Sequence, residues 1–192
     1  MAERLVIAVD CDDVLIPSRA FLVNEYNRRY GASVRLGQEF EEWGDEYNEV
    51  MRRCGEIAQS SQFKNLRPDT EAMEALCQLA QSHELHLVTA RKEDERDFTQ
   101  TALDAAAPGV FKSMNFLGWT ASKGDTCREL GADMLIDDSA HHLRGALQAG
   151  ISGGAILFGD YPWNRDDRAD EALVFCPDWN SVKEAIDAIA KA

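Results

Sequence analysis

The sequence of 192 residues has no long hydrophobic run and few basic residues. Its longest apolar stretches, such as residues 5–9 and 85–88, are far shorter than the roughly 20 residues that a membrane-spanning helix needs. Only 20 Lys and Arg stand against 34 Asp and Glu, which gives a formal net charge of −14. Such a surface repels nucleic acid phosphates and anionic lipid headgroups. We therefore expect neither a nucleic acid polymer nor a membrane as a partner.

The sequence also carries no C-x-x-C motif, and we expect no signal peptide. The five cysteines are an odd, scattered set without a C-x-x-C pair, which argues against a disulfide framework or a zinc site. Residues 1–4 lead directly into an apolar run, without the basic region and cleavage site of a signal peptide. We therefore expect a cytoplasmic protein with reduced thiols. The sequence does not indicate an oligomeric state.

Short apolar runs alternate with segments of helical periodicity along most of the chain. Continuous apolar runs are typical of parallel strands that are buried on both faces. The expected strands are residues 5–9, 86–88, 114–117, 134–136 and 155–158, and the expected helices are residues 69–81, 122–130, 139–149 and 180–190. This alternation predicts an α/β fold with a doubly wound, Rossmann-like parallel sheet.

One connection is much longer than the others. About 50 polar residues, 17–67, follow the first expected strand, whereas a crossover between parallel strands needs only about a dozen. The segment has a mostly helical pattern. We therefore predict a small helical cap over residues 17–67, inserted into a core that comprises residues 1–16 and 68–192.

Polar residues follow four of the expected strands at the point where each strand ends. Ligands of open α/β sheets bind outside the carboxyl ends of the strands, so these residues are candidates for one site. They are Asp10, Asp12 and Asp13 after the first strand, Thr89 and Arg91 after the second, Lys123 after the third, and Asp137 and Asp138 after the fourth.

Carboxylates that repel one another are commonly held together by a hard divalent cation, and Mg²⁺ suits a site with so few acids. A lysine and a threonine on the opposite side would supply positive charge and hydrogen bonds to phosphate oxygens, which is most of what phosphoryl transfer requires. The pattern therefore predicts a Mg²⁺ site that acts on a small-molecule phosphate monoester.

The motifs also resemble a known superfamily. The segments D-C-D-D-V-L from Asp10, L-V-T ending at Thr89, the lysine Lys123 and L-I-D-D-S with Asp137 and Asp138 are similar to the four motifs of the haloacid dehalogenase-like phosphatases, over residues 5 to about 140. The early cap, K-x-x-x-C-x-E-L-G-A-D-x-L-I-D-D-S and F-G-D-Y-P-W-N-R resemble bacterial 5'-nucleotidases related to the pyrimidine 5'(3')-deoxyribonucleotidases.

This resemblance implies a reaction and the residues that carry it. Asp10 would attack the phosphorus and form an aspartyl-phosphate. Asp12 would protonate the leaving alcohol and then, as a base, activate the water that releases phosphate. The implied activity is a Mg²⁺-dependent phosphomonoesterase for a small metabolite, with a nucleoside 5'-monophosphate as the expected substrate.

The resemblance also implies the metal and phosphate contacts. Asp10 and Asp138 would bind Mg²⁺ directly, Asp137 would reach it through water, and the backbone carbonyl of Asp12 would complete the set. The adjacent pair of acids leaves open which one binds directly. Thr89 and Lys123 would hold the phosphoryl oxygens.

Two positions depart from the family pattern. Asp13 stands where many members have glycine. Thr89 is followed by Ala-Arg, whereas the vertebrate deoxyribonucleotidases have serine and proline there, so their substrate preference does not carry over. Arg91 is either an extra phosphate or substrate contact, or a surface partner of Asp94 or Glu95.

Other residues near these motifs have simpler interpretations. We expect His141 and His142 to lie on the surface, and we expect Cys11 to point into the core. Trp163 and Arg165 line the entrance of the site or fix a loop. Five aromatic residues of the cap stack on a nucleobase or form its core: Phe21, Tyr26, Phe40, Trp43 and Tyr47.

Several alternatives to nucleotide hydrolysis stay open. One is a phosphatase for sugar phosphates or another small phosphoester. A second is a receiver-like signalling module, although in a receiver the acidic pair follows the first strand and no cap interrupts the chain. A third is a relative that binds phosphorylated ligands without turnover. Transfer of the phosphoryl group to an alcohol instead of water is a fourth.

Overall fold

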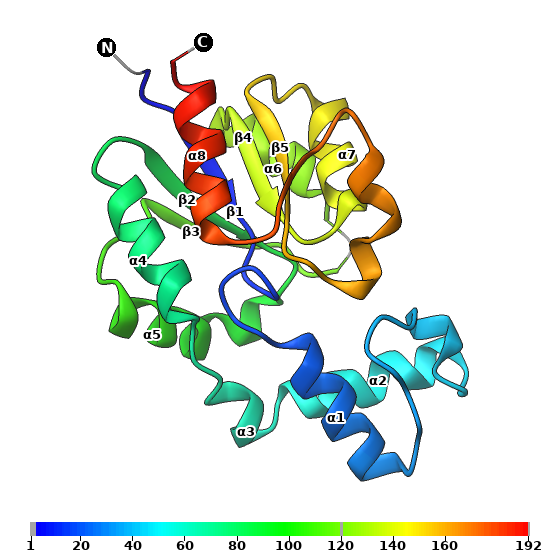
Figure 1. The fold of residues 1–192 in the computed structure, drawn as a ribbon. Helices are drawn as coiled ribbons and strands as arrows, with labels where there is room; N and C mark the ends of the chain where they lie inside the picture. Colours follow the sequence, from blue (N-terminus) through cyan, green and yellow to red (C-terminus); the bar gives the residue numbers. More distant parts are fainter. Residues whose placement is uncertain (1–2, 120, 192) are drawn as a thin grey trace.

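A six-stranded parallel sheet runs through the centre of the larger part of the molecule (Figure 1). The computed structural model describes residues 3–119 and 121–191, so residues 1–2, 120 and 192 of the predicted core lie outside it. The strands are β1 (Val6–Val9), β2 (Glu84–Thr89), β3 (Ser113–Phe116), β4 (Met134–Asp137), β5 (Gly154–Phe158) and β6 (Val174–Cys176). Their order is β3-β2-β1-β4-β5-β6. The doubly wound α/β fold and its first five strands are thus confirmed.

Successive residues of the central strands face opposite sides of the sheet. Ile7 and Val9 of β1 belong to one apolar cluster, and Ala8 between them belongs to another. All three are fully buried. Because both faces are covered, the strand has no polar alternation, which explains the continuous apolar run in the sequence.

Helices cover both faces of the sheet. The helices α4 (Thr70–Leu79), α5 (Arg96–Ala106) and α8 (Trp179–Ile189) contribute to the first cluster, and α6 (Lys123–Leu130) and α7 (Ala140–Ala149) contribute to the second. The side chain of Asp69 caps α4 by accepting a hydrogen bond from the backbone N–H of Ala72. Gly131 ends α6 in the left-handed conformation, with a φ of 65°. These local signals place the helices where the sequence predicts them.

A separate group of helices lies between β1 and α4. It comprises α1 (Arg19–Tyr30), the 3₁₀ turn η1 (Phe40–Glu42), α2 (Tyr47–Ala58) and α3 (Ser61–Lys64). Figure 1 shows this group beside the carboxyl ends of the strands, away from the sheet itself. Tyr26, Trp43, Val50 and Ile57 form its own buried apolar cluster. This separate cluster supports a division into a core and a cap over residues 17–67, which stays our proposal.

One strand, one helix and several short turns are not predicted from the sequence. The strand β6 has only three residues and lies at the sheet edge, and its Val174 is 40% exposed, so its apolar run is too short to recognise. In α5 the buried residues are Thr99, Ala102 and Leu103, a weak apolar stripe among polar residues. The short 3₁₀ turns η2 (Glu93–Glu95), η3 (Pro162–Asn164) and η4 (Asp166–Ala169) carry no periodic signal either.

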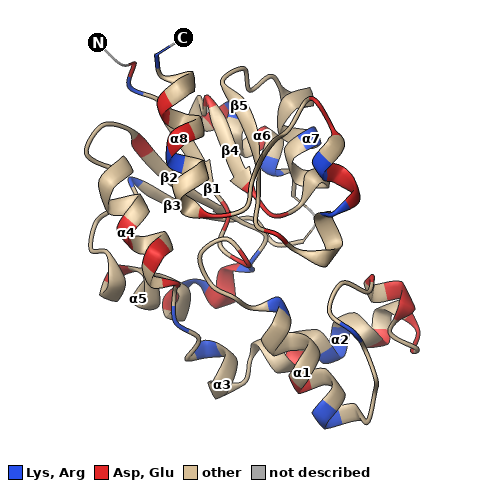
Figure 2. Cartoon of the chain, viewed as in Figure 1, with Lys and Arg blue, Asp and Glu red and all other residues tan. Residues whose placement is uncertain are grey.

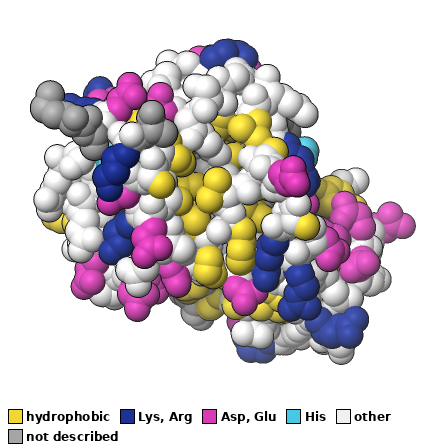
Figure 3. Space-filling view, turned by 45° about the horizontal axis from the view of Figure 1, so that its top comes forward, with side chains coloured by type: hydrophobic (Ala, Val, Ile, Leu, Met, Phe, Trp, Pro, Cys, Tyr) yellow, Lys and Arg dark blue, Asp and Glu magenta, His cyan; other side chains and the backbone are white. Residues whose placement is uncertain are grey.

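Charged side chains of both signs share the surface. On the face in Figure 3, the described Lys and Arg side chains are interspersed with Asp and Glu, and hydrophobic side chains occupy patches between them. This face offers no continuous basic stripe to a phosphate backbone. Of the helices described, none is both long and apolar enough to cross a membrane.

Candidate active site

The predicted site residues meet at the carboxyl ends of β1, β2 and β4. The register pairs Val9 of β1 with Leu87 on one side and Ile136 on the other. Asp10 therefore follows β1 beside the acidic pair that follows Ile136. Figure 2 shows acidic and basic positions together at this edge of the sheet, which faces the cap helices.

A crevice of about 440 Å³ lies between this edge and the cap. Both parts of the chain contribute to its wall. From the core come Asp10, Asp12, Asp13, Arg91, Glu95, Lys123, Asp137, Asp138 and His142, and from the cap come Arg19, Leu22, Phe40, Tyr47, Met51, Cys54 and Phe63. The polar groups thus lie on one side, and mainly apolar and aromatic groups lie on the other.

Three carboxylates form the centre of the crevice. Oxygen atoms of Asp10, Asp137 and Asp138 lie within 4.8 Å of one another. The ammonium of Lys123 lies 2.7 Å from Asp10 Oδ1 and 2.7 Å from Asp137 Oδ2. Lys123 is buried at the start of α6, so its charge acts on these two carboxylates with little screening by water.

The electrostatics of this group favour a further positive charge. Burial raises the pKa of Asp10 to about 7, with Lys123 opposing the shift and Asp137 adding to it. Burial also raises the pKa of Asp138 well above its ordinary value, and the neighbouring Asp137 adds to the effect. Although burial disfavours its charge, Asp10 and Asp137 raise the pKa of Lys123 and keep it protonated. When all three carboxylates are ionised, they and the one ammonium leave two negative charges, which a divalent cation with oxygen ligands matches.

The two oxygens of Asp137 already have partners. Oδ2 accepts a hydrogen bond from Lys123, and Oδ1 accepts one from the backbone N–H of Ser139 at 2.9 Å. In Asp138, Oδ2 accepts a hydrogen bond from the indole N–H of Trp163 at 2.7 Å. Asp138 therefore has more freedom than Asp137 to offer an oxygen to a cation.

Asp12 is held by Arg91 through two hydrogen bonds. The Nη2 and Nε atoms of Arg91 donate to the two oxygens of Asp12 at 2.7 and 3.0 Å. Burial opposes the charge of Asp12, but the guanidinium outweighs burial and lowers the pKa of this carboxyl. Arg91 itself is buried, and its Nη1 donates to Thr99 Oγ1 at 2.8 Å. The interpretation of Arg91 as a surface partner of Asp94 or Glu95 is wrong, because its side chain turns inward to a residue 79 positions away.

Thr89 lies at the end of β2 and is fully buried. Its hydroxyl accepts a hydrogen bond from the backbone N–H of Arg91 at 3.2 Å. The next residues, Ala90 and Arg91, line the crevice, but Thr89 is not part of its wall. The structure thus brings Asp10, Asp12, Lys123 and the acidic pair together, and it places Thr89 just behind them.

Asp13 stabilises the start of the cap through hydrogen bonds to its backbone. It adopts the left-handed conformation with a φ of 58°, which glycine adopts more readily. Its carboxylate accepts hydrogen bonds from the backbone N–H groups of Ser18 and Arg19, where α1 begins. Burial raises its pKa to about 7, and the charge of Asp12 adds to the shift. The carboxylate that replaces glycine therefore binds the first turn of α1.

Two predictions about neighbouring residues have different outcomes. Cys11 is fully buried within the main apolar cluster, and burial raises the pKa of its thiol, which confirms that it points into the core. His141 is exposed as expected. The surface interpretation of His142 is wrong, because its ring lines the crevice with Nδ1 4.0 Å from Asp137 Oδ2. His142 lies in the first turn of α7, which begins two residues after Asp138, and this closeness in sequence is the signal for its placement.

The cap aromatics divide between core and crevice. Tyr26 and Trp43 are buried in the cap cluster, with ring centroids 4.8 Å apart. Phe40 and Tyr47 line the crevice. Trp119, from the loop after β3, lines it from the other side and is 49% exposed. Aromatic faces are thus available at the mouth of the site.

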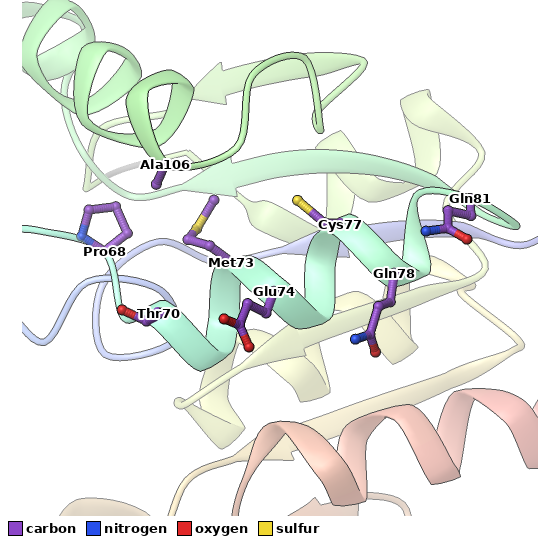
Figure 4. Close-up of a pocket in the computed structure, with 8 residues that line it drawn as sticks. All are labelled: Pro68, Thr70, Met73, Glu74, Cys77, Gln78, Gln81 and Ala106. Carbon is purple, nitrogen blue, oxygen red and sulfur yellow. The ribbon is translucent and has the colours of Figure 1, made fainter.

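A second hollow lies beside α4, away from the sheet edge (Figure 4). Figure 4 labels eight residues in its wall, among them Met73, Glu74 and Cys77. These eight residues offer one carboxylate and no basic group. The hollow therefore lacks the charges that phosphate chemistry requires.

Comparisons with known proteins identify the family and the fold. The family model for the protein "5' nucleotidase, deoxy (Pyrimidine), cytosolic type C" (NT5C) matches residues 4–192. No curated protein sequence matches the chain.

Solved structures with the same fold include three haloacid dehalogenase-like or related proteins. The hydrolase SP0104 from Streptococcus pneumoniae has a TM-score of 0.70 and 13% identity, covering 94% of this chain and 97% of that one. CbbY from Rhodobacter sphaeroides, in complex with phosphate, has a TM-score of 0.63 and 14% identity, with coverage of 97% and 100%. The hydrolase YfnB from Bacillus subtilis, bound to magnesium, has a TM-score of 0.63 and 12% identity, with coverage of 96% and 99%. At these identities the likeness shows the fold alone.

Proposed function

The chain belongs to the cytosolic type C 5'-nucleotidase family of haloacid dehalogenase-like phosphatases, and from this premise we propose that it hydrolyses nucleoside 5'-monophosphates with Mg²⁺ through a phosphorylated Asp10. The observation that carries the proposal is the group of Asp10, Asp137 and Asp138 around Lys123 at the floor of the crevice. Fold likeness alone would not select a reaction.

Mg²⁺ fits the donor set of this site. Asp10 and Asp138 would be its direct carboxylate ligands, together with the backbone carbonyl of Asp12. Asp137 would reach it through water, because both of its oxygens already accept hydrogen bonds from the protein. When bound, the cation would supply the positive charge that keeps Asp10 ionised and offsets the charge of the phosphoryl group.

Asp10 is the proposed nucleophile. One of its oxygens forms a bond with phosphorus while the bond from phosphorus to the leaving oxygen breaks. Lys123 would hold a phosphoryl oxygen from beside Asp10, where its ammonium lies. Thr89 is the second proposed phosphate contact, acting from the end of β2 behind the crevice wall. Thr89 ends β2 and Lys123 begins α6, so both donors would stand at ordered ends of secondary structure before reaction.

Asp12 is the proposed general acid and base. The leaving oxygen takes a proton from Asp12, and in the second half-reaction Asp12 takes a proton from the water that attacks phosphorus and releases Asp10. Arg91 keeps Asp12 ionised in the free protein, and an ionised carboxylate can act as the general base. The negative phosphate of a bound substrate would raise the pKa of Asp12, which suits the acid.

The cap supplies the contacts for the leaving group. Phe40, Tyr47 and Phe63 face the crevice together with Leu22 and Met51. Aromatic side chains of this kind stack on flat rings and would suit a nucleobase. A sugar phosphate has no flat ring, so this lining favours a nucleotide over it.

The test is phosphate release from a panel of substrates. Purified protein with Mg²⁺ would be given ribo- and deoxyribonucleoside monophosphates and sugar phosphates. Selective release from nucleotides, lost in EDTA and in Asp10→Asn, would support the proposal. Asp187→Asn is the matched control, since Asp187 is an exposed aspartate on α8 outside the crevice, and it should retain activity. Release from sugar phosphates alone would contradict the nucleotide assignment, and turnover by Asp10→Asn would contradict the covalent mechanism.

A further inference from the structure

Trp163 connects the acidic cluster with the loop that follows β5. Its indole N–H donates a hydrogen bond of 2.7 Å to Asp138 Oδ2. Among the side chains that the structure describes, only Trp163 donates a hydrogen bond to this carboxylate. The bond restricts the rotation of Asp138 and leaves Oδ1 for another partner.

The loop that carries Trp163 is fixed to the core. The buried side chain of Asn164 donates to the backbone oxygens of Phe158 and Gly159, each at 3.1 Å. Tyr161 stacks on Trp163 with ring centroids 4.4 Å apart and an angle of 6°. The Tyr161 hydroxyl donates to the backbone oxygen of Asp13 at 2.7 Å. The indole ring therefore has a defined position relative to the site.

The cap contacts the same tryptophan. The guanidinium of Arg19, at the start of α1, lies 5.2 Å from the ring centroid of Trp163 and 4.9 Å from that of Phe40. Its Nη2 donates to Gln38 O, while its buried Nε has no hydrogen-bond partner within the described part of the chain. The guanidinium thus uses its flat faces for two aromatic rings, an arrangement favoured by the negative faces of the rings.

A second contact brings the cap close to this loop. A Cβ atom on Gly37 of the cap would lie 2.6 Å from Pro162 Cβ, so Gly37 packs against the proline ring with no room for a side chain. Cap and core are therefore packed together next to Trp163.

We propose that Trp163 positions Asp138 for the cation, and that Arg19 of the cap acts on the same carboxylate by holding the Trp163 ring. The inference rests on the proposed function, since it takes Asp138 as a metal ligand. Groups that orient a metal ligand typically contribute 10- to 100-fold to metal affinity. The cap would then influence cation binding without supplying a ligand.

The experiment is a calorimetric titration of Mg²⁺ into the metal-free protein, without substrate. Trp163→Phe keeps an aromatic ring and loses the N–H donor, so its Kd for Mg²⁺ should rise about 10-fold. Arg19→Met keeps a long side chain and loses the cation, so its Kd should rise by a smaller factor than that of Trp163→Phe. The double variant should match Trp163→Phe, because two residues that act through one bond are not additive. Trp119→Phe, a tryptophan of the same crevice with no carboxylate partner among the described residues, should bind Mg²⁺ as the wild type does.

Other results would overturn the inference. If the wild type binds Mg²⁺ and both single variants bind it equally well, Trp163 and Arg19 do not position Asp138, although the proposed function stands. If the effects of the two substitutions on the Kd for Mg²⁺ are fully additive in the double variant, Arg19 does not act through Trp163. If the wild type binds no Mg²⁺, the proposed metal dependence and the inference both fail. Circular dichroism would confirm that each variant folds. If Trp163→Phe does not fold, an unchanged affinity of Arg19→Met for Mg²⁺ would also refute the proposal.

Discussion

The metal-free protein should become less stable as the pH rises from 5 to 8, because its acidic cluster resists ionisation. Burial raises the pKa of Asp10 from 3.8 to about 7. A carboxyl whose pKa is higher in the folded than in the unfolded chain favours folding while it is protonated, and it loses that advantage as the pH rises through the interval between the two values.

The magnitude follows from the two pKa values. The shift of Asp10 from 3.8 to about 7 corresponds to about 4 kcal/mol of unfolding free energy, of which about 2 to 3 kcal/mol falls between pH 5 and pH 8. Burial raises the pKa of Asp138 and shifts stability in the same direction. The lowered pKa of His142 acts in the opposite direction, because the folded protein favours its neutral form. Lys123, whose pKa is raised, stays protonated throughout this range.

The assay is urea unfolding in EDTA at pH 5 and pH 8, for the wild type and for Asp10→Asn. The asparagine cannot ionise, and it removes the Asp10 charge that adds to the raised pKa of Asp138, so the variant should lose less stability between the two pH values. The difference measures the contribution of Asp10 together with its coupling to this neighbour. At pH 8, Mg²⁺ should stabilise the wild type, since it binds only the folded site, and should stabilise the variant less. Equal pH dependence of the two proteins in EDTA would refute the electrostatic reasoning.

Three further predictions concern other parts of the molecule. Arg91→Met should lower the free energy of unfolding, measured in urea, by about 2 kcal/mol. This loss is smaller than for a fully buried ion pair, because Asp12 is partly exposed. Arg91→Lys keeps the positive charge and should lose less stability than Arg91→Met. Gly124→Ala should destabilise the protein by more than about 2 kcal/mol, because the new Cβ would lie 2.5 Å from a backbone oxygen of α7. The new Cβ of Gly55→Ala in α2 meets nothing within 4 Å, so this variant should be about 0.5 to 1 kcal/mol more stable. Thermal unfolding measures both effects. Tyr47→Ala should raise the KM for nucleoside monophosphates and leave the KM for methyl phosphate unchanged in steady-state assays, and equal effects on both would argue against a base contact.

Much of the fold is predictable from the sequence because parallel strands buried on both faces must be apolar throughout. The runs that became β1, β2, β4 and β5 are buried along almost their whole length. The edge strand β6 has no such pattern, because Val174 is exposed and only three of its residues pair with β5. Burial on both faces, and not the strand itself, produces the recognisable pattern.

The site was predictable in part for a related reason. Asp10, Asp12 and the acidic pair follow strands whose register places them at one edge, so their proximity follows from the topology. The partner of Asp12 did not follow, because Arg91 lies 79 residues away and its side-chain direction depends on packing.

The contacts of Trp163 could not be predicted from the sequence either. Its hydrogen bond to Asp138 spans 25 residues and a loop without periodicity. Its contact with Arg19 depends on how the cap packs against the core. Motif spacing therefore located the acids, whereas the groups that orient them required the structure.

The most direct test of the central claim is a rapid-quench measurement of the phosphorylated enzyme. The protein would be mixed with Mg²⁺ and a nucleoside monophosphate, quenched in acid within a single turnover, digested and examined by mass spectrometry. The account predicts one phosphoryl group on the peptide that contains Asp10, absent in EDTA and in Asp10→Asn. Single-turnover phosphate release by the wild type without any phosphorylated peptide at any quench time, together with turnover by Asp10→Asn, would contradict it.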